Sequence, residues 1–354
     1  MAPKRSKPTG SDTPFAPPRF LSSLTRKHHD TVQDKGLIQE IGIDIHSFDP
    51  LPRVREILTG YGWMPFNNML GECNTTVVEF YANALAYGVG DYRSYVRGVT
   101  ISFSPDVIDA TFGFRPEDYC GVRKRRASWR DGVITDAEYD QMREALAMPG
   151  KDWRYSTQGA RQRLQATEMM PLAKLWSRWW IHNFEECSNQ SEIIMARYLA
   201  VYSIMMGESI QVGRMIAQSI KPMITSSDTY IGHPFVISHL YSLDGVPEED
   251  DDNIIGPQVP LGERFLSRAQ WDLDRAVAAH QGQQQPHQPP QQHVPQPPPK
   301  QHQFTDYELG MAATQYDQHV LIDWGLPRYS PQMMAAVQGY KAQHPLPSYR
   351  QQYP

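Results

Sequence analysis

The sequence predicts a mainly α protein: a single helical domain with one small β-hairpin, flanked by disordered termini. Between residues 36 and 247, apolar side chains recur every three or four positions, which is the period of a helix with one buried face. One pair of β-prone runs interrupts this period. Only 40% of the 354 residues are hydrophobic and 29 are proline, a composition that indicates folded chain diluted by unfolded chain.

Caps mark the first two helices of the predicted domain. Asp49 is a candidate N-cap with Pro50 in the first turn, and a second helix follows the candidate cap Asn74. The apolar face of the first helix consists of Val54, Ile57, Leu58 and Tyr61. The apolar face of the second consists of Val77, Val78, Tyr81, Ala84 and Leu85. This spacing predicts one buried side for each helix.

A change of period predicts the hairpin. Residues 92–96 and 99–103 are β-prone runs, and Arg97 and Gly98 between them suit a tight turn. Directly afterwards, the segment 104–106 reads Ser-Pro-Asp, which combines an N-cap, a first-turn proline and an acid favoured by the helix dipole. We therefore expect a helix immediately after the hairpin.

The later helices are predicted in the same way. Thr135 and Glu138 have the spacing of a capping box. A helix after Pro171 carries aromatic residues at helical spacing, which predicts that they belong to the core: Trp176, Trp179, Trp180 and Phe184. Further helical stretches are expected over residues 191–206, 212–220 and 234–243.

Composition sets the expected domain boundaries. The acidic run Glu248–Asp252 should stay solvated, because adjacent like charges repel. In the segment 281–303, 20 of the 23 residues are Gln, Pro or His, which predicts a disordered linker. The expected parts are a disordered arm (1–35), the helical core (36–247), an acidic edge with a helix (248–280), the linker (281–303) and a C-terminal tail (304–354).

The candidate binding site is the basic segment 121–130, expected as a loop between two capped helices. Its candidate residues are Arg123, Lys124, Arg125, Arg126, Trp129 and Arg130. Such cations can contact the phosphates of a nucleic acid, and a tryptophan can stack on a base. The segment equally suits nuclear import, or an exposed surface whose cations meet nearby acids such as Asp131, Asp136 and Glu138. The sequence leaves these interpretations open.

No catalytic residue, metal site or cofactor is predicted. The chain has no nucleophile-elbow or phosphate-loop motif, and His182, Cys187, His233 and His239 lack metal-ligand spacing. The sparse cysteines, at positions 73, 120 and 187, form no Cys-x-x-Cys pair and indicate reduced thiols in an intracellular protein. The longest apolar run, 193–207, contains an arginine and is too short to span a membrane.

The order of several motifs resembles a known family. Residues 77–84, VVEFYANA, are similar to its V-x-E-F-Y-A-N signature, and residues 95–104 are similar to the V-R-G-x-x-V-x-F-S segment that follows. The segments 176–184, 204–216 and 232–240 continue the resemblance in order. The family is the putative plant transposon protein domain, and the resemblance covers about residues 50–247. It implies a sequence derived from a plant mobile element and brings no established catalytic residues with it.

The leading hypothesis is a non-enzymatic helical module of plant retroelement origin that binds protein or nucleic acid. Two alternatives belong to other classes. A divalent-metal nuclease or strand-transfer enzyme requires carboxylates that converge in space. A self-assembling, capsid-like protein requires contact between copies of the chain. The candidate partners are nucleic acid at the segment 121–130, another protein or a second copy of the chain, and a nuclear location is expected.

Overall fold

The computed structural model describes residues 18–88, 90–187, 192–250, 252–284, 309 and 331–343. The chain divides into two compact units, residues 1–285 and 286–354. In the second unit, Val337 of α14 (Pro331–Gln343) is buried against Leu309, Met333 and Tyr340. This helix was not expected in the tail 304–354.

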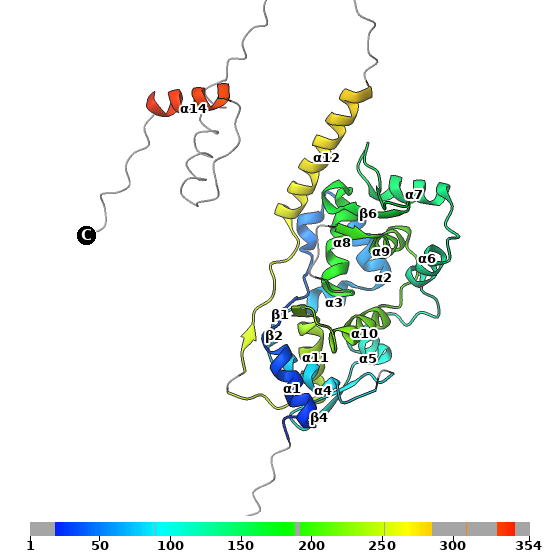
Figure 1. Ribbon diagram of the computed structural model, residues 1–354, viewed down its shortest axis with the longest axis vertical. Coiled ribbons are helices and arrows are strands. Elements are labelled where there is room, and N and C mark those ends of the chain that lie inside the picture. Colours follow the sequence, from blue (N-terminus) through cyan, green and yellow to red (C-terminus); the bar gives the residue numbers. More distant parts are fainter. Residues whose placement is uncertain are drawn as a thin grey trace, which may run out of the picture. The chain divides into compact units, whose positions relative to one another are not determined.

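The first unit is mainly helical, which confirms the predicted fold class, and α8 packs against α9 within it (Figure 1). Two short 3-10 helices, η1 (Ile45–Phe48) and η2 (Ala166–Glu168), join longer elements. The α-helices are α1 (Ser23–Val32), α2 (Arg53–Tyr61), α3 (Met64–Met69), α4 (Val77–Ala84), α5 (Pro105–Phe112), α6 (Gly121–Arg130), α7 (Asp136–Leu146), α8 (Pro171–Asn183), α9 (Met195–Met206), α10 (Val212–Met223), α11 (Pro234–Asp244) and α12 (Glu263–Gln284).

The predicted hairpin is present as the antiparallel pair β3 (Arg93–Val96) and β4 (Val99–Ser102). Its turn residues Arg97 and Gly98 both have positive φ, 47° and 90°, as a two-residue hairpin turn requires. Three small sheets were not predicted, because their strands are only two to five residues long and most of them pair segments far apart in the sequence. They are β1 (Gly36–Leu37) with β8 (Tyr230–Ile231), β2 (Cys73–Asn74) with β9 (Ile254–Ile255), and β5 (Arg154–Tyr155) with β6 (Arg161–Gln165) and β7 (Glu192–Ile194).

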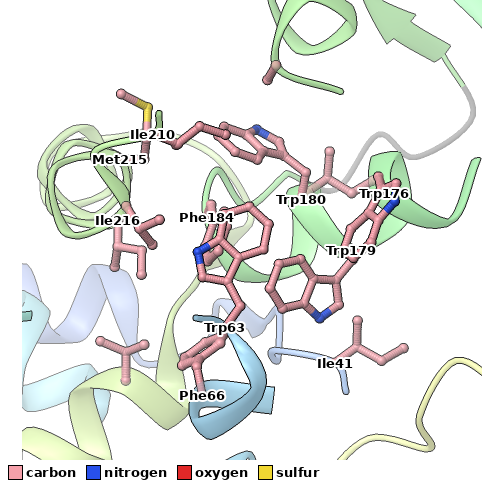
Figure 2. Packing of buried hydrophobic residues seen from close by; sticks show 14 of the residues in the cluster. Ile41, Trp63, Phe66, Trp176, Trp179, Trp180, Phe184, Ile210, Met215 and Ile216 are labelled. Atoms are coloured by element: carbon pink, nitrogen blue, oxygen red, sulfur yellow. The ribbon is translucent and has the colours of Figure 1, made fainter. Parts of the chain in front are cut away.

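The aromatic core confirms the burial predicted for the helix after Pro171. Trp176, Trp179, Trp180 and Phe184 each have 0% of their surface exposed. Figure 2 shows them converging with Trp63, whose ring centroid lies 5.2 Å from that of Trp179 and 5.1 Å from that of Phe184. These ring contacts connect the end of α8 with the start of α3 inside the hydrophobic core.

The N-terminal boundary of the predicted core is corrected by α1. Ser22 caps this helix by accepting a hydrogen bond from the Thr25 backbone N–H, and Thr25 and Val32 are buried. The helix packs against α4, and the side-chain oxygen of Asn83 on α4 accepts a hydrogen bond from the Leu21 N–H at 3.1 Å. The expected disordered arm, residues 1–35, therefore does not extend over residues 18–35. Residues 1–17 lie outside the described part.

One residue of the acidic run, Asp252, differs from the expected solvated state, whereas Glu248, Glu249 and Asp250 are exposed as predicted. Two hydrogen bonds join the Asp252 carboxylate to the Arg97 guanidinium, one of them 2.8 Å long, and only 7% of the Asp252 side chain is exposed. Arg97 further donates to the Pro247 carbonyl at 2.8 Å, and its Nε lies 3.5 Å from a Glu249 oxygen. The run thus fastens the chain to the hairpin turn. Beyond it, α12 includes residues 281–284 of the expected linker, while residues 285–303 lie outside the described part.

Candidate functional site

The basic segment 121–130 is the helix α6, so its expected loop conformation was wrong. Arginine, lysine and alanine are good helix formers, and they dominate this segment. Only Gly121 and Val122 are buried in it, so the apolar period that identifies other helices is missing. The helix starts where the Gly121 N–H donates to the Ser209 carbonyl at 2.8 Å, which fixes α6 beside the turn after α9. The cations are therefore held on a regular scaffold.

Arg125 lies on the inner face of α6. Its Nε donates to both oxygens of Glu208, at 3.0 and 2.9 Å, and its guanidinium carbon lies 4.7 Å from the ring centroid of Tyr202. Gly121 is required next to this pair, because a Cβ at position 121 would approach the Glu208 Cβ to 2.7 Å. Arg125 thus fastens α6 to α9.

Arg126 makes the second inner contact. Its two terminal nitrogens donate to the two oxygens of Glu185 at 2.5 and 2.6 Å, and its Nε donates to the Ala196 carbonyl at 2.8 Å. Glu185 accepts a further hydrogen bond from the Trp180 indole at 2.8 Å. Burial opposes ionisation of Glu185, but the hydrogen bonds and the positive charge of Arg126 outweigh it, so the pKa of this carboxyl is lowered. Arg126 is therefore a structural residue.

Three cations remain on the outer face of α6. Arg123, Lys124 and Arg130 are exposed. Arg123 makes one long hydrogen bond to the Gln211 side chain, at 3.4 Å, and the Lys124 ammonium lies 5.8 Å from the ring centroid of Tyr119. Trp129 is partly buried and packs against the core, which limits its use as a stacking platform. The structure thus divides the six candidate residues into an inner and an outer set.

Two of the three acids proposed as partners of the basic segment have other contacts. Asp136 pairs with Arg161 at 2.8 Å, and Glu138 closes the predicted capping box with Thr135. The acids that do bind α6, Glu185 and Glu208, are distant in sequence, so local charge spacing gave no signal for them. A test for a partner-facing surface therefore has to use the outer set alone.

A metal-dependent nuclease requires carboxylates that converge where a phosphodiester can reach them. Among the described residues, the single group of three or more candidate metal ligands consists of Glu40, Glu186 and His233. It holds two carboxylates, and the three residues are 5%, 6% and 0% exposed. A phosphodiester cannot reach so buried a group. Sequence reasoning missed the cluster because its members come from three separate segments.

Two further observations bear on the expectations from the sequence. Cys73 and Cys120 are buried free thiols. No helix in the described part of the chain combines the length and apolar composition needed to cross a membrane.

Comparison with known proteins confirms the resemblance found in the motifs. Residues 59–247, just over half of the chain, match a family described as "Putative plant retrotransposon-related domain". The matched range contains α6, Glu186 and His233, whereas Glu40 precedes it. The comparisons with curated proteins and with solved structures found no match.

Proposed function

The chain belongs to the putative plant retrotransposon-related domain family, and we propose that it is a non-enzymatic helical module that binds nucleic acid through the outer face of α6. The observation that carries this proposal is the presence of three exposed cations on a helix whose other face is fastened by ion pairs. Arg123, Lys124 and Arg130 have no strong ion pair among the described residues, unlike Arg125 and Arg126.

The spacing on α6 suits phosphate contacts. Arg123 and Arg130 are seven residues apart, which places them on one side of the helix about 10 Å from each other. A guanidinium can donate two parallel hydrogen bonds to one phosphate, and Lys124 adds a point charge beside them. The formal net charge of −5 does not oppose such binding, because charges beyond about 8 Å are largely screened at physiological salt.

The inner ion pairs support the outer set. Because Arg125 and Arg126 fix α6 against Glu208 and Glu185, the outer cations need no ordering of the backbone when a partner binds. This arrangement favours binding over catalysis. The buried position of Glu40 and Glu186 speaks against the nuclease alternative, since neither carboxylate can meet a phosphodiester.

The test is the salt dependence of binding to a mixed-sequence DNA duplex. Replacement of Arg123, Lys124 and Arg130 by Ala should lower the slope of log K against log salt by about 3, since each phosphate contact contributes about 0.9. The matched control removes three exposed cations of α12, Arg264, Arg268 and Arg275, and should leave the slope unchanged. Equal slopes for the two triple variants would overturn the proposal.

A nuclear location forms part of the same proposal. The outer face of α6 is also a possible import signal, and the two roles separate experimentally. If the triple variant keeps its DNA affinity but leaves the nucleus in fluorescence microscopy, α6 serves import alone. If the DNA affinity falls, the binding role stands.

A further inference from the structure

Three segments meet at the start of α11. Glu40 lies before η1, Glu186 lies after α8, and His233 is the residue before the first turn of α11. The Glu40 oxygens accept hydrogen bonds from the backbone N–H groups of Phe235 and Val236 at 3.0 and 2.9 Å. Glu186 Oε2 accepts one from the His233 N–H at 2.6 Å. Both carboxylates thus satisfy backbone donors at the N-terminus of α11.

Other polar atoms in this cluster have no partner. Glu186 Oε1 and both ring nitrogens of His233 are buried without a hydrogen-bond partner among the described residues. His233 Nδ1 and Glu186 Oε1 lie 3.6 Å apart, which is too long for a hydrogen bond. Buried polar groups are almost always satisfied, so unpaired ones that point at each other indicate a missing ion or water.

The two carboxyl groups of the cluster also lack a cationic partner. In the described part of the chain, neither Glu40 nor Glu186 forms an ion pair with a lysine or an arginine. Burial raises the pKa of Glu40 to about 7 and that of Glu186 well above its usual range, and the negative charge of Glu40 raises the pKa of Glu186 further. A neutral imidazole has one nitrogen with a free lone pair, and neither ring nitrogen of His233 has a hydrogen-bond partner in the described structure, so one of them can coordinate an ion.

We propose that Glu40, Glu186 and His233 bind one divalent transition-metal ion, with Zn²⁺ as the best match, and that this ion fastens α11 to the two segments that carry the carboxylates. One ligand atom from each residue lies within 4.8 Å of the others. Two carboxylates neutralise a divalent ion, and an imidazole nitrogen favours zinc-like metals over Ca²⁺ or Mg²⁺, which take oxygen ligands. Water completes the coordination.

Two cavities border residues of the cluster. Glu40 lines a cavity of about 350 Å³ and Glu186 lines another of about 340 Å³. Neither cavity brings a large ligand to His233, which has no exposed surface. The inferred ion is therefore structural, and its role is separate from the outer face of α6.

The experiment uses the full chain, stripped with a chelator and titrated with Zn²⁺. Bound zinc is measured by elemental analysis and stability by the thermal midpoint. We expect one equivalent of tightly bound zinc per chain and a midpoint raised by several degrees, because an ion that binds the folded state alone stabilises it. E186Q should lose this equivalent. E185Q is the matched control and should keep it, since Glu185 belongs to the neighbouring ion pair.

Two further measurements keep the result decisive. The variant H287Q/H293Q/H302Q, in the segment 285–308, measures adventitious binding by histidines outside the cluster. If E186Q folds poorly, amide hydrogen exchange of the wild-type chain is measured with and without zinc instead. Zinc should selectively slow the exchange of the Phe235 and Val236 amides. Zinc that disappears with the triple histidine variant and not with E186Q would overturn the proposal, and so would unchanged exchange at the start of α11.

Discussion

Glu185 and Glu186 are adjacent in sequence but belong to two regions with opposite electrostatics. Glu185 faces α6, where Arg126 and Trp180 satisfy its carboxylate, and its pKa is lowered. Glu186 faces Glu40 and His233, with no arginine or lysine beside it in the described structure, and its pKa is raised. In the first region, side chains of the protein itself satisfy the buried carboxylate. In the second region, no such cationic side chain is present among the described residues.

This difference shows how a buried carboxylate is accommodated. The cost of removing a charge from water is offset by a hydrogen-bonded cation, or the group must take up a proton or an external ion. In the region around α6 the carboxylate pairs with a cation of the protein. In the cluster at α11 the carboxyl groups have to take up a proton or an external ion. Substitutions that disturb one region should therefore have effects that the other does not share.

The largest effect is expected for Gly232→Ala, which disturbs the cluster at α11. A Cβ at position 232 would lie 1.7 Å from Glu186 Oε2 and 3.1 Å from the Glu186 Cβ, so the buried carboxylate would have to move. Overpacking of this kind should reduce the free energy of unfolding by about 3 kcal/mol. The measurement is urea denaturation of the purified chain.

Gly256→Ala is the control for this prediction. Nothing lies within 4 Å of a Cβ at position 256, and its stability should stay within about 0.5 kcal/mol of the wild type. If the two alanine variants unfold at the same urea concentration, Glu186 is not confined as described.

The second effect concerns the ion pair between α6 and Glu185. Arg126→Met should lower the free energy of unfolding by about 2 kcal/mol, because Glu185 would keep only the Trp180 indole as a side-chain donor. Adding Glu185→Gln should recover part of this loss, since the neutral amide needs no cation. Urea denaturation of the single and double variants measures both changes. A double variant less stable than Arg126→Met would contradict the role assigned to the pair.

Much of the fold follows from local patterns, whereas the charged sites do not. The hairpin at Arg97 and Gly98 and the burial of Trp179 were predicted because turn chemistry and helical period act within a few residues. The helix α6 was missed because its core contact is reduced to its first turn. The partner of Arg126 and the neighbours of Glu186 come from remote segments, and no local rule specifies such pairs.

The third effect extends the comparison to another paired carboxylate, Asp252. Hydrogen bonds from Arg97 lower its pKa from 3.8 to about 2. Because the folded pKa lies below the unfolded one, the stabilisation is complete above about pH 4 and is lost as the pH falls towards 2. The difference corresponds to about 2 kcal/mol. Urea denaturation between pH 2 and pH 6 should show this loss in the wild type and a flatter profile in Asp252→Asn. If the stability of the wild type and that of Asp252→Asn change in parallel with pH, the ionised Asp252 does not stabilise the fold.

The smallest effect separates the two faces of α6 itself. Arg123→Ala should leave the free energy of unfolding within about 0.5 kcal/mol of the wild type, because an exposed cation with one long hydrogen bond contributes little. The loss in the free energy of unfolding caused by Arg126→Met, three residues further along the same helix, should then be at least three times the loss caused by Arg123→Ala. A loss as large as that of Arg126→Met would mean that the outer face also holds the fold together. Stability that is unchanged alongside a weakened salt dependence of DNA binding would instead assign the outer face to the partner and the inner face to the fold.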